Sequence, residues 1–171
     1  EIMPSLVGSE MCIRDSPSGM NAVVTAMELA RRRCQSKQLK RFVAIGLLYT
    51  DTYSLLIMDK WRGGNGEPFF LNTDDLGQLE DVLKDESFAG IVTESITNPL
   101  GELPDIPRIQ ETAKRFEIPV IVDNTLAGPT NAQPLVWGAD MVIHSTAKYL
   151  CGNNQHGGGP YWLARDIGLN N

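Results

Sequence analysis

Two short segments of this chain are apolar on both faces and end in a polar or charged residue, and this pattern restricts the possible folds most. They read Ile-Pro-Val-Ile-Val-Asp at 118–123 and Asp-Met-Val-Ile-His at 140–144. A strand that is apolar on both faces must be covered by other elements on both sides, which is typical of parallel sheets. The sequence therefore predicts an α/β domain, with a mainly parallel sheet sandwiched by helices.

The rest of the chain alternates between helical and strand-like segments, as this architecture requires. Helical spacing of apolar residues, or an acidic or Ser-Gly start, predicts helices at 18–33, 50–58, 74–84 and 105–116. Short runs rich in branched and aromatic residues predict further strands at 41–46, 68–71, 89–94 and 161–164. The carboxyl ends of such strands line the ligand crevice of an α/β domain, and Glu94, Asp123 and Ser145 fall there.

The start of the chain has an unusual sequence. Residues 6–16 read Leu-Val-Gly-Ser-Glu-Met-Cys-Ile-Arg-Asp-Ser, which resembles one reading frame of a transposase adapter used in preparing DNA libraries. Segments of this origin are left out of fold reasoning. We therefore expect residues 1–16 to be non-native and poorly packed, and 17–171 to be part of a longer natural domain. The alternative is a native loop that spells the same string.

Charge and cysteine content exclude several classes of function. The formal net charge of −6 is spread without long charge runs, so the chain lacks the concentrated basic face that nucleic acids and membrane surfaces require. No apolar run approaches the roughly 18 residues of a membrane span. Cys12, Cys34 and Cys151 show no paired spacing, which argues against a disulfide framework or a zinc site. We expect a cytoplasmic protein with a small-molecule partner.

Asp123 and Lys148 are the residues most suited to chemistry. Asp123 ends a buried strand, where an unpaired carboxylate costs several kcal/mol, so it needs a cation, solvent or a ligand as partner. Lys148 follows the next apolar strand and is flanked by hydroxyls and by a glycine-rich segment at 151–159. A lysine there is either an ordinary surface charge or a nucleophilic amine beside a phosphate site.

Five motifs along the chain resemble the signature of one family, in order and in spacing. They are Ser-Gly-Met at 18–20, Thr-Asn-Pro at 97–99, Val-Asp-Asn-Thr at 122–125, Gly-Ala-Asp at 138–140 and His-Ser-x-x-Lys-Tyr at 144–149. The family is that of the Cys/Met-metabolism pyridoxal-phosphate enzymes, the cystathionine γ-synthase and lyase group. The resemblance implies part of the large domain of a fold-type I pyridoxal-phosphate-dependent transferase, without its N-terminal arm and C-terminal domain.

The resemblance also implies roles for the matching residues. Lys148 corresponds to the Schiff-base lysine, and Asp123 to the acid that keeps the pyridine nitrogen of pyridoxal 5'-phosphate protonated. The other expected cofactor-binding residues are Ser18, Gly19, Met20, Tyr49, Asn98, Ser145 and Thr146. Of these, Tyr49 would stack on the ring and Asn98 would contact its phenolic oxygen. The phosphate would bind at the helix start at 18–20 and at the hydroxyls.

Departures from the family pattern keep alternatives open. Ala147 stands where the family has Thr, and the segment at 152–158 keeps its glycines but loses an acidic residue. The family's Tyr-x-Arg phosphate clamp, donated by a neighbouring subunit, and its arginine for the substrate carboxylate match nothing in this chain. We therefore expect the chain alone to be inactive and its longer parent to be a homo-oligomer.

The implied function is a transsulfuration-type enzyme that acts on sulfur amino acids or activated homoserine, by elimination or replacement at the β or γ carbon. Synthase, lyase and sulfhydrylase all remain open at this stage. The alternative is a non-catalytic member that binds the cofactor or only keeps the fold. A nucleotide-binding domain is disfavoured, because neither Gly-x-Gly-x-x-Gly after the first strand nor Gly-Lys-Ser/Thr occurs.

Overall fold

The strands pair into one seven-stranded sheet in the order β1-β7-β6-β5-β4-β2-β3. The computed structural model describes residues 11–34, 41–58, 67–84, 88–152 and 157–164. The strands are β1 (Met11–Arg14), β2 (Arg41–Ile45), β3 (Phe69–Leu71), β4 (Phe88–Glu94), β5 (Val120–Asp123), β6 (Met141–Ile143) and β7 (Tyr161–Ala164). Strands β2 to β6 are parallel, and β7 is antiparallel to both β6 and β1. The predicted α/β class with a mainly parallel sheet is confirmed.

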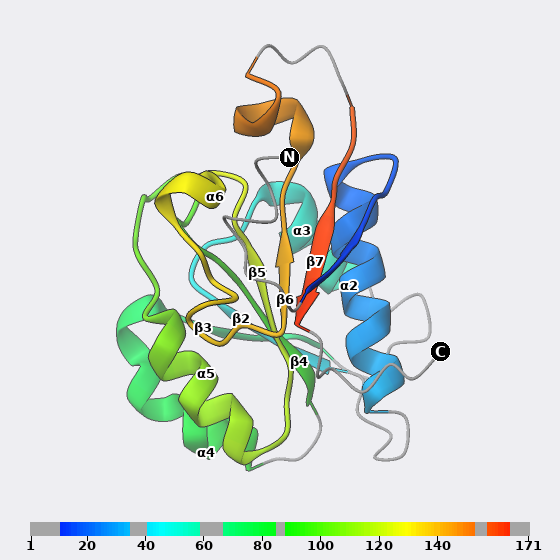
Figure 1. Cartoon of the computed structure of the whole chain (residues 1–171). Helices are drawn as coiled ribbons and strands as arrows, with labels where there is room; N and C mark the ends of the chain where they lie inside the picture. The colour runs from blue at the N-terminus through cyan, green and yellow to red at the C-terminus, as the bar shows by residue number, and fades with distance from the viewer. Residues whose placement is uncertain (1–10, 35–40, 59–66, 85–87, 153–156, 165–171) are drawn as a thin grey trace.

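Helices cover both faces of the sheet (Figure 1). They are α2 (Gly19–Arg33), α3 (Thr50–Met58), α4 (Leu79–Leu83), α5 (Ile106–Arg115) and α6 (Gly128–Asn131), with a 3-10 segment η3 (Thr73–Gln78) and a π-type turn η4 (Thr146–Leu150). The helix predicted over 74–84 is interrupted, since Asp75 leaves helical geometry and α4 begins only at Leu79. Asp75 and Gly77 are of residue types that form helices weakly, which explains why the α-helix begins only after Gln78.

The strands divide their side chains between two cores, because successive residues of a strand point to opposite faces. Ala44, Val92 and Ile121 pack with α2 and α3 in one core. Val43 and Ile91 pack with α4 and α5 in the other. This double burial is the physical reason for segments that are apolar on both faces. Within the described residues, no helix is both long and apolar enough to cross a membrane.

Residues 11–14 take part in the sheet through their backbone, whereas the expected poor packing of residues 1–16 in the core stays a prediction. Strand β1 pairs along its length with β7, from Met11 opposite Ala164 to Arg14 opposite Tyr161. Ser16 is tied to the glycine-rich segment, because its Oγ donates to the Gly159 carbonyl at 2.6 Å. Leu6 and Val7 lie outside the described residues. The adapter origin of residues 1–16 stays a prediction.

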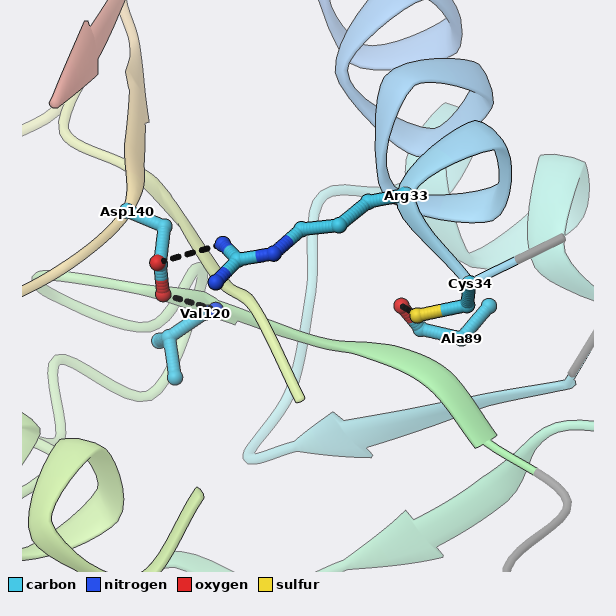
Figure 2. A network of polar contacts seen from close by, with 5 residues as sticks. All are labelled: Arg33, Cys34, Ala89, Val120 and Asp140. Carbon is cyan, nitrogen blue, oxygen red and sulfur yellow. Dashed lines mark hydrogen bonds and ion pairs between the residues drawn. The ribbon is translucent and has the colours of Figure 1, made fainter. Parts of the chain in front are cut away.

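At the edge of the sheet opposite its carboxyl ends, Asp140 joins three elements (Figure 2). Its Oδ1 forms an ion pair of 3.0 Å with Arg33 at the end of α2, and its Oδ2 accepts the Val120 N–H of β5 at 2.8 Å. The Asp140 N–H donates in turn to the Val120 carbonyl at 3.0 Å. The neighbouring Cys34 thiol donates to the Ala89 carbonyl at 3.6 Å. The Gly-Ala-Asp motif therefore fixes α2, β5 and β6 relative to one another.

Candidate active site

Above the carboxyl ends of β4, β5 and β6 lies a pocket of about 760 Å³. Glu94, Asp123 and Ser145 each stand two residues beyond a buried residue that packs on the α2 face, namely Val92, Ile121 and Ile143. Alternation along a strand therefore brings all three to the α2 side of the sheet. The first turn of α2 forms the facing wall. The pocket volume lies within the range of roughly 300–1,000 Å³ typical of small-molecule sites.

Nearly all residues predicted from the sequence line this one pocket. The lining contains Ser18, Gly19, Met20, Tyr49, Asn98, Asp123, Ser145 and Lys148. Thr146 is not among the lining residues. Its backbone N–H donates to the Gly158 carbonyl at 3.0 Å, and a Cβ on Gly158 would lie 2.8 Å from the Thr146 hydroxyl. Ala147 lines the pocket instead, so this stretch presents a methyl group where a hydroxyl was expected.

The start of α2 packs closely against the carboxyl end of β6. Ser18 caps the helix, since its side chain accepts the Asn21 N–H at 3.1 Å. A Cβ added to Gly19 would lie 3.1 Å from the Ser145 Cβ, so a small residue allows this approach. The first N–H groups of a helix have no partner within the helix, and the helix dipole favours an anion there. The first turn of α2 and Ser145 thus form a cradle suited to a phosphate group.

The Asp123 carboxylate is held by a hydrogen bond from a residue two positions further along the chain. Its Oδ1 accepts the Thr125 N–H at 2.9 Å, and desolvation by burial raises the pKa of the carboxyl despite the hydrogen bonds from Thr125. The Thr125 hydroxyl in turn accepts the Ser145 N–H at 2.8 Å, which links the ends of β5 and β6. No cation is recorded beside Asp123 among the described residues. A desolvated carboxylate of this kind is matched to a ligand that carries a protonated nitrogen.

Glu94 is a second carboxyl group in the same pocket. It is only 6% exposed and pairs in register with Asp123. Its side chain accepts the backbone N–H of Tyr49. Burial, followed by the charge of Asp123, raises the pKa of Glu94 to about 7, against lowering by the backbone hydrogen bonds from Tyr49 and Asn98. Sequence reasoning placed Glu94 at the strand end but gave it no role.

Lys148 stands in the turn that follows β6, where η4 projects past the sheet (Figure 1). The turn is kinked at Lys148 itself, with φ −91° and ψ −115°. The side chain is exposed and borders the pocket, as does its neighbour Tyr149. The amine is therefore accessible to a ligand that enters the pocket.

Tyr49 lies on another wall, immediately before α3, and is 44% exposed. A hydrogen bond from its hydroxyl to the Asp51 carboxylate, together with the charge of that carboxylate, raises the pKa of the phenol. Asn98 is exposed in the turn after β4 and borders the same pocket. The aromatic ring of Tyr49 and the amide of Asn98 thus line the same pocket as Asp123 and Lys148.

Behind the pocket, His144 and Asn124 are buried. The Asn124 amide donates to the Ala132 carbonyl at 2.8 Å and lies 3.5 Å from the His144 Nε2. Burial lowers the pKa of His144 to about 4, so the ring is neutral near pH 7. Sequence reasoning also missed Val23, Thr125 and Leu126, which line the pocket. The motif Val-Asp-Asn-Thr at 122–125 already contained the signal for Thr125.

Comparison with known proteins gives consistent matches. The family model described as Cys/Met metabolism PLP-dependent enzyme matches residues 2–162. Cystathionine gamma-synthase of Haemophilus influenzae is 36% identical over 107 residues, which are 63% of this chain and 29% of that protein. O-acetyl-L-homoserine sulfhydrylase of Corynebacterium glutamicum is 34% identical over 112 residues, 66% of this chain and 25% of that protein. The chain thus spans about a quarter of the length of these relatives.

A solved structure agrees with the sequence matches. It is that of an O-acetylhomoserine (thiol)-lyase from Campylobacter jejuni, with a TM-score of 0.75 and 28% sequence identity. The similarity covers 91% of this chain and 36% of that protein. That crystal structure contains N'-pyridoxyl-lysine-5'-monophosphate, so one lysine of that protein carries the cofactor.

Proposed function

Because the chain belongs to the Cys/Met-metabolism PLP-dependent enzyme family, we propose that its pocket binds pyridoxal 5'-phosphate and that the protein is a transsulfuration-type enzyme. Its reaction would be elimination or replacement at the β or γ carbon of a sulfur amino acid or activated homoserine. One observation carries the proposal. A single pocket brings together an exposed lysine, a desolvated carboxylate and a helix N-terminus that lies more than 100 residues before both of them in the sequence.

The residues of the pocket fit each part of this cofactor. Lys148 would be the covalent attachment point, and the Asp123 carboxylate would hold a proton on the ring nitrogen. Tyr49 would cover the ring face, and Asn98 would contact the phenolic oxygen. The phosphate would be bound by the backbone of Gly19 and Met20 and by the Ser18 and Ser145 side chains. We leave Thr146 out of this set, since its side chain does not line the pocket.

When bound, the cofactor supplies an electron sink for the carbanion at the substrate α-carbon. The chain's own residues orient it and control protons. Asp123, half-buried and desolvated, would favour the protonated ring nitrogen because an adjacent positive charge stabilises the charged form of the carboxylate. Lys148 is positioned to take and return the α-proton, since its amine borders the same pocket. Elimination, replacement and sulfhydrylation share these steps, which is why the proposal stops at the reaction class.

We also propose that the protein acts in the cytoplasm as a homo-oligomer. Several apolar side chains are strongly exposed in the described residues, including Leu100 at 60%, Leu103 at 73% and Val136 at 67%. Exposed apolar groups of this size favour contacts with other protein surfaces.

Among the described residues, no arginine lines the pocket. The group that would bind the carboxylate of an amino-acid substrate is therefore not assigned to any of them.

The test measures cofactor attachment. The chain is titrated with pyridoxal 5'-phosphate, reduced with borohydride, digested and analysed by mass spectrometry. We expect a visible absorption band and a mass increment on the peptide that contains Lys148. Lys148→Ala should abolish both, whereas Lys114→Ala, which removes an exposed lysine on α5, should change neither. Attachment elsewhere would contradict the proposal, and turnover of activated homoserine by a full-length Lys148→Ala protein would favour a non-catalytic role for the site.

A further inference from the structure

Glu94 ends a strand that is buried along its whole length. All seven residues of β4 are buried, and Glu94 is the last of them. In a protein interior a carboxyl group is costly unless it accepts hydrogen bonds. The Glu94 carboxylate accepts the backbone N–H of Tyr49, which holds the group in place without neutralising it.

Tyr49 lies at the start of another element. It precedes α3, and its own carbonyl accepts the Tyr53 N–H at 2.9 Å. The hydrogen bond from the Tyr49 N–H to the Glu94 carboxylate therefore connects the start of α3 to the end of β4. Tyr49 and Glu94 both line the pocket, as does Asn98 in the turn that follows β4.

We propose that Glu94 is a positioning residue, which fixes the backbone of Tyr49 and so sets the place of the aromatic side chain that would stack on the cofactor ring. This inference rests on the proposed function and deepens it. Glu94 occupies the register position beside Asp123. The Asp123 carboxylate accepts a hydrogen bond from Thr125 in its own loop, which leaves it available to a ligand. The Glu94 carboxylate instead accepts the Tyr49 N–H from a separate segment, which suits it to hold the pocket wall in place.

The first experiment needs no cofactor. Amide hydrogen exchange at Tyr49 is measured by NMR in the wild type, Glu94→Gln and Glu94→Ala. In Glu94→Ala the Tyr49 amide should exchange at least tenfold faster, because it loses its acceptor. Glu94→Gln keeps one carbonyl oxygen, so the Tyr49 amide should exchange at a rate between those of the wild type and Glu94→Ala. The Val120 amide, bound by Asp140, should be unchanged in every variant.

The second experiment adds pyridoxal 5'-phosphate. In Glu94→Gln we expect affinity to fall about tenfold, the scale of one hydrogen bond to a charged group. The induced circular dichroism per bound cofactor should also fall, because the ring loses its fixed surroundings. Glu102→Gln, which alters a carboxyl near the same turn but outside the pocket, is the matched control. Glu94→Gln also tests the role if Glu94→Ala does not fold.

The outcomes separate the two proposals. Unchanged exchange at Tyr49 in Glu94→Ala overturns the inference, whatever the cofactor does. Faster exchange with an unchanged dichroism signal per bound cofactor reduces Glu94 to a structural role and overturns it as well. If the wild type itself attaches no cofactor at Lys148, the proposed function fails, and the inference about ring placement fails with it.

Discussion

Gly159 allows the glycine-rich segment to contact the phosphate cradle, and Gly159→Ala tests how closely the two are packed. An added Cβ would lie 2.5 Å from the Gly19 Cα, 2.5 Å from the Ser18 carbonyl oxygen and 2.6 Å from the Gly19 nitrogen. Carbon atoms in contact prefer roughly 3.5–4.0 Å, so the overlap is about 1 Å. All three atoms are backbone, so no side-chain rotation relieves it. Either the segment at 157–159 or the first turn of α2 must move by about that distance.

We expect Gly159→Ala to lower the free energy of unfolding by about 2–3 kcal/mol, at the upper end of overpacking costs. Displacing Gly19 should also weaken binding of pyridoxal 5'-phosphate about tenfold, because a charge-assisted hydrogen bond to the phosphate would lose its geometry. Urea denaturation and cofactor titration measure the two effects.

Gly157→Ala is the matched control, from the same segment. Its Cβ would lie 3.9 Å from the Pro17 carbonyl oxygen, an ordinary contact. We expect Gly157→Ala to leave both quantities within experimental error. If Gly159→Ala behaves like Gly157→Ala, the close approach between this segment and α2 does not exist in solution, and the account of the cradle is wrong.

Two further predictions concern stability. Burial raises the folded-state pKa of Glu94 to about 7, so its contribution is fully present below pH 4.5 and is lost as the pH rises through 7, by at most about 3 kcal/mol. His144 has the opposite sign, because its folded-state pKa is lowered from 6.5 to about 4 and its contribution is lost as the pH falls through that range. The two oppose each other between pH 4.5 and 6.5. From pH 4 to 6.5 the free energy of unfolding should therefore rise more steeply in Glu94→Gln than in the wild type, as measured by urea denaturation. The same pH profile in both proteins would refute these assignments. At the other edge of the sheet, Asp140→Ala should cost about 1.5–3 kcal/mol, since the Val120 N–H loses its charged acceptor, whereas Arg33→Ala should cost less than about 1 kcal/mol. Equal losses in the two variants would show that the ion pair, not the hydrogen bond to Val120, carries the effect.

The sequence alone predicted the layered α/β domain, and the reason is local. Segments such as 118–123 are apolar on both faces, which only a covered strand satisfies, and the structure buries Ile121 in one core and Val122 in the other. The capping of α2 by Ser18 was also predictable, because the side chain and the amide that it binds are three residues apart. Because parallel strands end at one edge, the sequence further placed Asp123 and Ser145 together.

Local pattern could not give the antiparallel direction of β7, which depends on how it packs beside β6, or its pairing with β1, which joins segments about 150 residues apart. The same holds within η4, where a backbone kink at Lys148 brings Ala147 to the pocket while Thr146 packs near Gly158. The hydroxyl groups of Ser145 and Thr146 look equivalent in the sequence. Only the geometry of the turn shows that Ser145 lines the pocket and Thr146 does not.

Strand patterns and the family that the motifs resemble together predicted that a carboxylate, a lysine and a helix start would lie at one edge of the sheet. Tertiary structure alone decided what Glu94 and Gly159 do there. The partner of Glu94 is a backbone amide, a group that every residue except proline carries and that no sequence pattern marks. The contact at Gly159 depends on how closely two remote segments pack, and that distance is set by the whole core beneath them.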